Sequence, residues 1–219
     1  MKLLVLLFFS LPILSLCAQS PRNIGLKMQL DSAWQLDQKY RELLSNGISN
    51  SLIKDSISKS LNIPPEQVTN TLWKLQNSID STNLIFVEAI LLKYGYPGKT
   101  LVGEETSEAA WNIIQHSQKI DQYLQLIRNA ATKKELPFKL YAMMYDRYLV
   151  NHKKEQIYGT QIKLVHLKNG QNGWFVWPIK NPQQVNSLRR KAGFNQSVEE
   201  NAKRLDVDYS VIKISDLRL

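Results

Sequence analysis

The sequence predicts a mainly α-helical domain that is closed by one C-terminal β-hairpin. Up to about residue 150, apolar residues recur every three or four positions, which is the period of an amphipathic helix. After Gln156 the pattern changes to two short segments, 157–168 and 174–179, that are rich in β-branched and aromatic residues. The NGQNG sequence between them offers the left-handed backbone positions that a hairpin turn needs.

The N-terminal segment MKLLVLLFFSLPILSLCAQS is typical of a secretory signal peptide. Its apolar stretch, Leu3 to Leu16, is interrupted by a proline and is shorter than the roughly 18 residues that a membrane span needs. We interpret residues 1–18 as the signal peptide, with cleavage after Ala18 and no transmembrane segment in the mature chain. The localisation predicted is therefore the periplasm or the exterior of the cell.

A lipoprotein anchored through Cys17 is the alternative, because LSLC resembles a lipid-attachment box in which Leu16 replaces the usual small residue. Cys17 is the only cysteine, so cleavage after Ala18 would leave no thiol for a disulfide, a nucleophile or a thiolate metal site. The remaining chain is long enough for a sizeable core. We divide it into an N-terminal helical extension, 19–79, and a helical core with the hairpin, 80–219.

The positive charge is concentrated in one block of the chain. Residues 119–191 carry 14 basic and 4 acidic side chains, whereas residues 19–97 carry 8 and 7. Such a block is either a solvated face or a surface that attracts an anionic ligand. Nucleic acid is not expected as a partner, since the chain is predicted to be exported and has no recognition motif.

Each helix follows from its apolar spacing and its end signals. The first runs over residues 26–44 and stops at Gly47, and another begins at Pro64-Pro65. The segment LIFVEAILL, 84–92, is apolar on every side except Glu88, which predicts a central buried helix. Helical spacing continues over 120–131 and 138–149. After the hairpin, with Pro178 at a strand end or edge, two short helices are predicted near 182–192 and 197–205.

His116 and Asp146 are the candidate catalytic residues. Both are placed beside the apolar stripe of their helices, so each needs a partner within the fold. His116 is either a core-edge histidine bound to backbone or a general base, because imidazole titrates near neutral pH. A general base needs a carboxylate to fix its tautomer, and Asp146 could be that carboxylate. Arg147 follows Asp146 directly, and adjacent helical residues cannot satisfy one another.

The VGEE and YGTQ sequences supply further polar candidates. Glu104 and Glu105 follow a glycine turn, where they either cap a helix or join His116 and Asp146 at a divalent ion. Their spacing matches no metal-ligand motif, so no metal is expected. In YGTQ, Gly159 is either a simple turn or a point of close approach for a ligand. No nucleophile elbow, phosphate-binding loop or dinucleotide fingerprint is present, and no cofactor is expected.

An ordered series of short motifs runs through residues 80–193. It comprises Asp80-x-x-Asn83, YGYPG at 94–98, VGEE at 102–105, AAW at 109–111, Gln115-His116, YAMMYDR at 141–147, YGTQ at 158–161 and WPIKNPQQV at 177–185. This series resembles an uncharacterised bacterial family, a domain of unknown function, whose members carry D-x-x-N, GWPG, VG, QH, DR and YGTQ in that order. Tyr96 stands where that family usually has tryptophan. The resemblance nominates positions and names no reaction.

Two classes of function stay open. In a binding module of the cell envelope, an anionic or polar ligand would contact a set of polar residues from these motifs. They are Arg147, Tyr158, Thr160, Gln161, Glu105 and Asn83. In a metal-independent hydrolase or transferase, His116 would be the general base and Asp146 would orient it. The lack of an obvious nucleophile favours binding.

We predict that protein recovered from its native host begins at Gln19, because signal peptides are cleaved after a small residue and Ala18 is such a residue. Intact-mass and N-terminal peptide analysis by mass spectrometry measures this. A diacylated Cys17 at the N-terminus would contradict the prediction and would establish the lipoprotein alternative.

Overall fold

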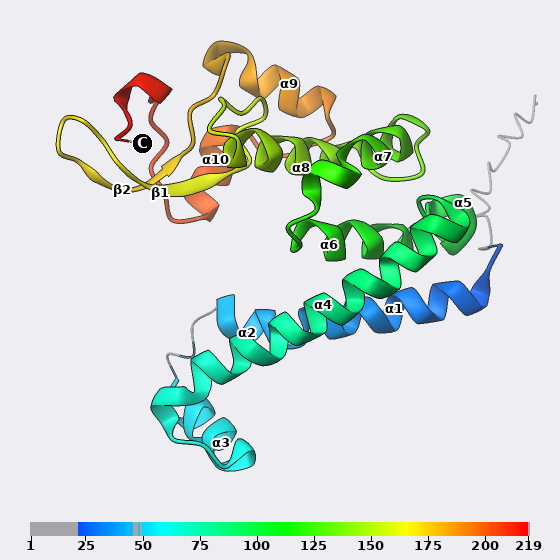
Figure 1. Cartoon of the computed structure of the whole chain (residues 1–219). Helices are drawn as coiled ribbons and strands as arrows, with labels where there is room; N and C mark the ends of the chain where they lie inside the picture. Colours follow the sequence, from blue (N-terminus) through cyan, green and yellow to red (C-terminus); the bar gives the residue numbers. More distant parts are fainter. Residues whose placement is uncertain (1–21, 46–47, 49, 219) are drawn as a thin grey trace, which may run out of the picture.

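The structure is a computed structural model that describes residues 22–45, 48 and 50–218. The predicted signal peptide, Cys17 and the predicted helix stop at Gly47 lie outside the described residues. The chain is mainly helical and carries a two-stranded antiparallel hairpin near its C-terminus, so the predicted fold class is confirmed (Figure 1).

The long helices and the hairpin set the framework of the molecule. Their bounds, in chain order, are α1 (Ile24–Gln38), α2 (Arg41–Ser45), α3 (Ser51–Leu61), α4 (Val68–Tyr94), α5 (Lys99–Val102), α6 (Ala109–Gln115), α7 (Ile120–Thr132), α8 (Phe138–Asn151), β1 (Ile162–His166), β2 (Asn172–Val176), α9 (Val185–Lys191) and α10 (Val198–Arg204). Short 3-10 turns precede α4, α6 and α9.

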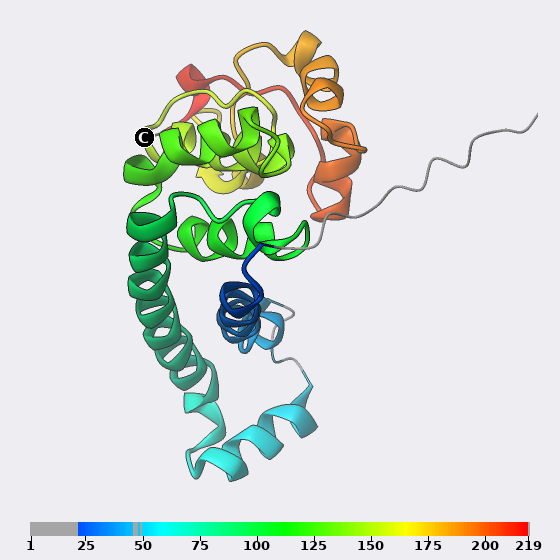
Figure 2. The same cartoon turned by 90° about the vertical axis from the view of Figure 1, so that its right-hand side faces the viewer.

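The helices form two parts that meet at α6. In Figure 1, α1 lies along α4, α3 stands at one end of α4, and α6 lies between this pair and α8. The second part contains α7, α8, α9, α10 and the hairpin (Figures 1 and 2). One apolar core joins α1, α4, α6, α7 and α8, while two smaller clusters lie under the hairpin and under α9 and α10.

Helix α4 combines two predictions, one correct and one wrong in part. The Pro64-Pro65 start is confirmed, since a 3-10 turn from Pro65 to Gln67 leads directly into α4. The segment 84–92 is helical but is only the last part of α4, and it is not buried all round. Ile85 and Leu92 are 70% and 91% exposed, because α1 and α6 pack on one face of α4 only. The predicted division at residue 79 falls inside this helix.

The hairpin is confirmed with shorter strands than its apolar segments predict. Ile162 pairs with Val176 and His166 with Asn172, and Pro178 follows the end of β2 as predicted. Residues 157–161 form a loop instead of the start of the first strand, because their amide groups bind a buried carboxylate described below. The two predicted short helices are confirmed as α9 and α10. A capping box of Ser197 and Glu200 begins α10.

Two glycines with positive φ allow a matched test of the fold. Gly159 has φ +65°, and a Cβ there would overlap with the side chains of Val198 and Ile179. Gly170, at the tip of the hairpin, has φ +92° but open space around it. Both positions carry the backbone strain of a side chain in the left-handed region, and only Gly159 adds a steric conflict.

We therefore predict that Gly170→Ala lowers the free energy of unfolding by about 1 kcal/mol, the usual cost of a left-handed L-residue. Gly159→Ala should cost a further ~1–3 kcal/mol, because the added methyl overpacks the core beneath α10. Urea denaturation of the two variants beside the wild type measures both values. Equal losses would show that the chain around Gly159 moves aside at no cost.

Candidate functional site

Asp146 organises the loop that follows α8. Its carboxylate is fully buried and accepts the amide N–H groups of Ile157 (2.7 Å), Tyr158 (3.1 Å) and Thr160 (3.1 Å). The hydroxyl of Thr160 donates a further hydrogen bond of 3.0 Å. Burial raises the pKa of Asp146 above its ordinary value, and these hydrogen bonds act in the opposite direction. Asp146 is therefore a partner of the loop backbone.

The side chains of Gln156 and Arg189 also form hydrogen bonds with the backbone of this loop. Gln156 donates from Nε2 to the carbonyl oxygens of Gln161 (3.0 Å) and Trp177 (2.7 Å), and its Oε1 accepts the amide of Gln161 (2.9 Å). Arg189 donates from Nη1 to the carbonyl of Tyr158 (2.8 Å). We call residues 156–161 the Asp146 loop. Its backbone is fixed at both ends, so the side chain of Gln161 has a defined position.

Arg147 forms a hydrogen bond with the side chain of Gln161. Its Nε donates to Oε1 of Gln161 (3.2 Å), and its Nη1 donates to the carbonyl of Gln115 (3.0 Å). Both acceptors are neutral, and in the described part of the chain no carboxylate pairs with Arg147. Burial lowers the pKa of Arg147, and the nearby positive charge of Arg41 lowers it further. A guanidinium placed in this way is stabilised by an added anion.

His116 lies at the end of α6, where its partner is Asp37 of α1. Nδ1 of His116 is 3.2 Å from both carboxylate oxygens of Asp37. The expected pairing with Asp146 is therefore wrong. The physical reason is that Asp146 is occupied by the backbone of its own loop. Nε2 of His116 has no hydrogen-bond partner among the described residues, and the side chain is 20% exposed.

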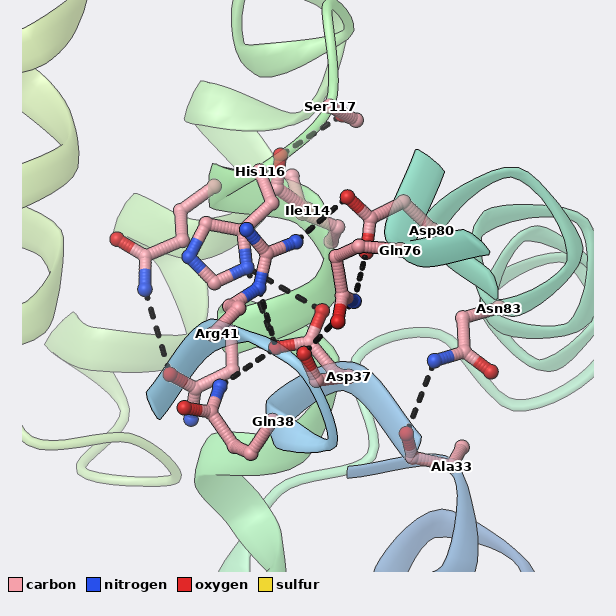
Figure 3. A network of polar contacts seen from close by, with 12 residues as sticks. Ala33, Asp37, Gln38, Arg41, Gln76, Asp80, Asn83, Ile114, His116 and Ser117 are labelled. Atoms are coloured by element: carbon pink, nitrogen blue, oxygen red, sulfur yellow. Dashed lines mark hydrogen bonds and ion pairs between the residues drawn. The ribbon is translucent and has the colours of Figure 1, made fainter. Parts of the chain in front are cut away.

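Asp37 belongs to a network that joins α1, α2, α4 and α6 (Figure 3). Its carboxylate is fully buried and accepts a hydrogen bond of 2.7 Å from Nε2 of Gln38. Arg41 lies between the two carboxylates, with Nη2 at 2.6 Å from Asp80 and Nε at 3.5 Å from Asp37. Gln76 donates to Asp80 (2.8 Å) and to the carbonyl of Asp37 (2.9 Å). We call the residues Asp37, Arg41, Gln76, Asp80 and His116 the Asp37 cluster.

The charges of this region set its chemistry. Two carboxylates, Asp37 and Asp80, face Arg41, and the positive charge of Arg41 acts on Arg147. Asp37 fixes the imidazole through Nδ1, which favours a proton on Nδ1 and leaves Nε2 as an acceptor. The arrangement can therefore take up a proton at Nε2 or accept a hydrogen bond there. Nε of Arg41 is the one fully buried side-chain nitrogen or oxygen without a hydrogen bond in the part of the chain that is described.

The other predicted site residues do not all join this cluster. Asn83 is buried and donates to the carbonyl of Ala33 (2.9 Å), which fastens α4 to α1. The ring of Tyr158 lies near Phe194, and burial raises the pKa of its hydroxyl. The hydroxyl of Thr160 is engaged by Asp146. Of the predicted set, Asp146 contacts Tyr158 and Thr160. Arg147 contacts Gln161 and also binds the carbonyl of Gln115, the residue before His116.

Glu105 lines a surface cavity of about 590 Å³ beside the Asp37 cluster. We call it the Trp34 cavity; its lining residues are Lys27, Asp31, Trp34, Gln35, Gln38, Glu42, Glu105 and Asn112. Gln38 connects it to Asp37 by a hydrogen bond, and Asn112 stands one helical turn before His116. A ligand in this cavity would therefore lie next to the Asp37–His116 pair.

Within residues 22–45, 48 and 50–218, no cluster of three or more histidine, cysteine or acidic side chains could hold a metal ion. The helices in this part of the chain also lack the combination of length and apolar character that crossing a membrane requires.

The sequence reasoning missed Asp37, Arg41 and Gln76. One signal was present, because Leu26, Leu30, Ala33 and Asp37 occupy one face of α1 at spacings of three and four residues. A carboxylate on a buried apolar stripe is costly without partners, and so indicates a polar network. Arg41 follows Asp37 by four residues, which is the spacing of an intrahelical ion pair, although the helix breaks between them.

Comparison with known proteins assigns the chain to a family but indicates no activity. No curated protein and no solved structure matches the chain. A model of a family of unknown function, DUF6624, matches residues 37–214. This match spans the Asp37 cluster, Arg147 and the Asp146 loop, and it agrees with the resemblance of the motif series to an uncharacterised domain family. The chain therefore belongs to this family of unknown function.

Proposed function

We propose that this chain is an exported bacterial protein of the cell envelope that binds a small polar or anionic ligand between Arg147 and His116. The N-terminal pattern of residues 1–18 supports export. The observation that carries the binding site is Arg147, a partly buried guanidinium held by two neutral acceptors, whose pKa burial and the positive charge of Arg41 lower. Such a group gains free energy when an anion approaches.

The side chains around Arg147 are arranged to recognise a ligand that carries both an anionic group and a hydrogen-bond donor. Arg147 retains donor capacity on Nη1 and Nη2, because a guanidinium has five N–H groups and only two are bonded. Nε2 of His116 offers an acceptor on the neighbouring helix end. The Trp34 cavity is connected to Asp37 through the hydrogen bond of Gln38, and neither Arg147 nor His116 lines it.

A second candidate function rests on the contact between His116 and Asp37. A buried carboxylate on Nδ1 leaves Nε2 free to act as a general base, as in other histidine–aspartate pairs. Arg147 would then bind the anionic group of a substrate, and water would be the nucleophile of a metal-independent hydrolase. Asp37 takes the orienting role that sequence reasoning gave to Asp146.

The first test compares the two arginines. Arg41→Ala should lower the free energy of unfolding by about 3–5 kcal/mol, because it strands the partners Asp37 and Asp80 in a mostly buried site. Arg147→Ala should cost only about 1–3 kcal/mol, since it removes hydrogen bonds to two neutral acceptors and strands no charge. Chemical denaturation of both variants measures the difference. A larger loss for Arg147→Ala than for Arg41→Ala would contradict the view that Arg147 is reserved for a ligand.

The second test separates binding from catalysis with His116→Gln, which keeps hydrogen-bonding capacity but cannot take up a proton near neutral pH. Wild type, His116→Gln and Arg147→Gln would be screened by thermal shift against acetate, benzoate, phenyl phosphate and phenyl sulfate at equal ionic strength. Binding predicts a ligand-induced stabilisation that Arg147→Gln abolishes and His116→Gln only weakens. No stabilisation of the wild type beyond that of Arg147→Gln would refute the binding site.

The same variants would be assayed for hydrolysis of p-nitrophenyl acetate and p-nitrophenyl phosphate. Loss of a general base typically lowers turnover by about 10²–10⁴-fold, so a hydrolase predicts this loss in His116→Gln with an unchanged melting temperature. Turnover that is equal in wild type and His116→Gln would remove the catalytic candidate. If His116→Gln unfolds the protein, the histidine is structural.

A further inference from the structure

We propose a second ligand site in the cavity beside Arg189, which binds a small organic oxyanion, a phosphate ester or a carboxylate. This cavity measures about 510 Å³, within the range of small-molecule pockets. It is formed by α8, α9, α10 and the residues between α9 and α10. We call it the Arg189 cavity; its polar lining includes Glu108, Lys139, Thr160, Arg189, Asn201 and Arg204.

Arg189 is the buried charged residue of this site, and the fold holds its side chain in place. The residue is only 2% exposed, and its guanidinium is held by hydrogen bonds from Nε to the carbonyl of Gln196 (2.8 Å) and from Nη1 to that of Tyr158 (2.8 Å). It also lies over the ring of Phe194, with 4.6 Å from Cζ to the ring centroid. A buried guanidinium is thus fixed in one orientation at the edge of a cavity.

One nitrogen of this guanidinium is left for a ligand. Nη2 of Arg189 has no hydrogen-bond partner among the described residues. Nε of Arg41 is the one fully buried side-chain nitrogen or oxygen without a hydrogen bond in the described chain. Nη2 of Arg189 also lacks a hydrogen bond but is not fully buried, so it keeps contact with solvent. Arg189 lines the cavity and is only 2% exposed, so a ligand in the cavity is well placed to reach this nitrogen.

The surroundings favour an anion over a cation. Lys139 and Arg204 line the same cavity, and no carboxylate pairs with either of them in the described chain. Nδ2 of Asn201 is a further donor without a partner among the described residues, since Asn201 uses Oδ1 to accept from Arg204. Three cations and one free amide donor therefore stand around the cavity, against one acidic lining residue, Glu108.

Acidic groups near Arg189 do not neutralise it directly. Asp146, Glu199 and Glu200 lie near enough to favour its charge, but each has its own donors. Asp146 binds the loop amides, Glu199 accepts from Asn186 (2.9 Å), and Glu200 accepts from the amide of Ser197 (2.7 Å). An oxyanion could therefore form a charge-assisted hydrogen bond with Nη2.

The apolar part of the lining indicates that the oxyanion belongs to an organic molecule. Leu140, Met143 and Phe194 line the cavity beside the charged groups. A ligand with an apolar body next to a phosphate or carboxylate would bury that body against these side chains, with a gain that free inorganic phosphate lacks. This proposal does not rest on the Arg147 site, whose residues do not line the Arg189 cavity.

The test is isothermal titration of the full mature chain with phenyl phosphate, benzoate and inorganic phosphate at constant ionic strength. We expect phenyl phosphate or benzoate to bind more tightly than inorganic phosphate, and the tighter of the two identifies the class of oxyanion. Lys139→Gln and Arg204→Gln should each weaken binding about two- to fivefold, the range of exposed ion pairs. Their double variant should lose about the product of the two factors, if the sites are independent.

Two further variants make the result specific. Lys203→Gln removes an exposed charge beside Arg204 that does not line the cavity, and it should leave the affinity unchanged. Glu108→Gln removes the one acidic lining residue and should strengthen binding. Lys139 and Arg204 are exposed, so their substitution does not endanger folding, unlike that of Arg189.

Arg147→Gln identifies binding at the other site. Affinity that falls in Arg147→Gln but not in Lys139→Gln or Arg204→Gln would overturn the proposal. Equal loss in Lys203→Gln and Arg204→Gln would overturn it as well, because it would show attraction by net charge alone.

Discussion

The buried carboxylate of Asp146 is the interaction on which both candidate sites depend. An ionised carboxylate in an apolar interior is unfavourable unless its oxygens receive several hydrogen bonds. The loop after α8 supplies them from three amides and one hydroxyl. This arrangement holds Gln161 toward Arg147 and the carbonyl of Tyr158 toward Arg189. Without it, each arginine would lose one of its two acceptors.

Asp37 is buried to the same degree and acts differently. Its partners are mainly side chains, from Gln38, Arg41 and His116, and they come from different helices. A carboxylate satisfied by its neighbouring backbone stabilises a loop conformation. One satisfied by side chains from several helices fixes how those helices pack. Asp146 therefore fixes a loop, whereas Asp37 ties helices together.

Helical periodicity, together with the β-branched segments and the NGQNG turn after Gln156, was sufficient to predict the fold class, the hairpin and the short helices after it. It failed where burial depends on which elements cover a helix, as for Ile85 and Leu92 on the open face of α4. Apolar composition predicts that this segment is helical, but the packing of neighbouring helices determines which of its faces are buried. The predicted start of the first strand was wrong for a related reason. The amides of residues 157–160 donate to Asp146 and are therefore not available to pair with the second strand.

For the candidate site, sequence reasoning nominated His116, Arg147 and Gln161 but assigned the wrong carboxylate to the histidine. Asp37 is 79 positions away from His116, so no local pattern connects them. Only the packing of α1 against α6 brings them together. The apolar stripe of α1 carried a clue, because an aspartate on it had to find partners somewhere. Which partners these are is a property of the tertiary structure.

The continuity of α4 fixes the geometry of the Asp37 cluster. Gln76, Asp80 and Asn83 stand on one uninterrupted helix and contact α1 and α2 at three successive points. Each residue of an α-helix turns the chain by about 100°. One inserted residue between Gln76 and Asn83 would therefore rotate these anchors apart, so that no single docking of α4 on α1 could satisfy them all. Length changes in this stretch are thus expected to be tolerated far less than in the exposed turn that joins α3 to α4.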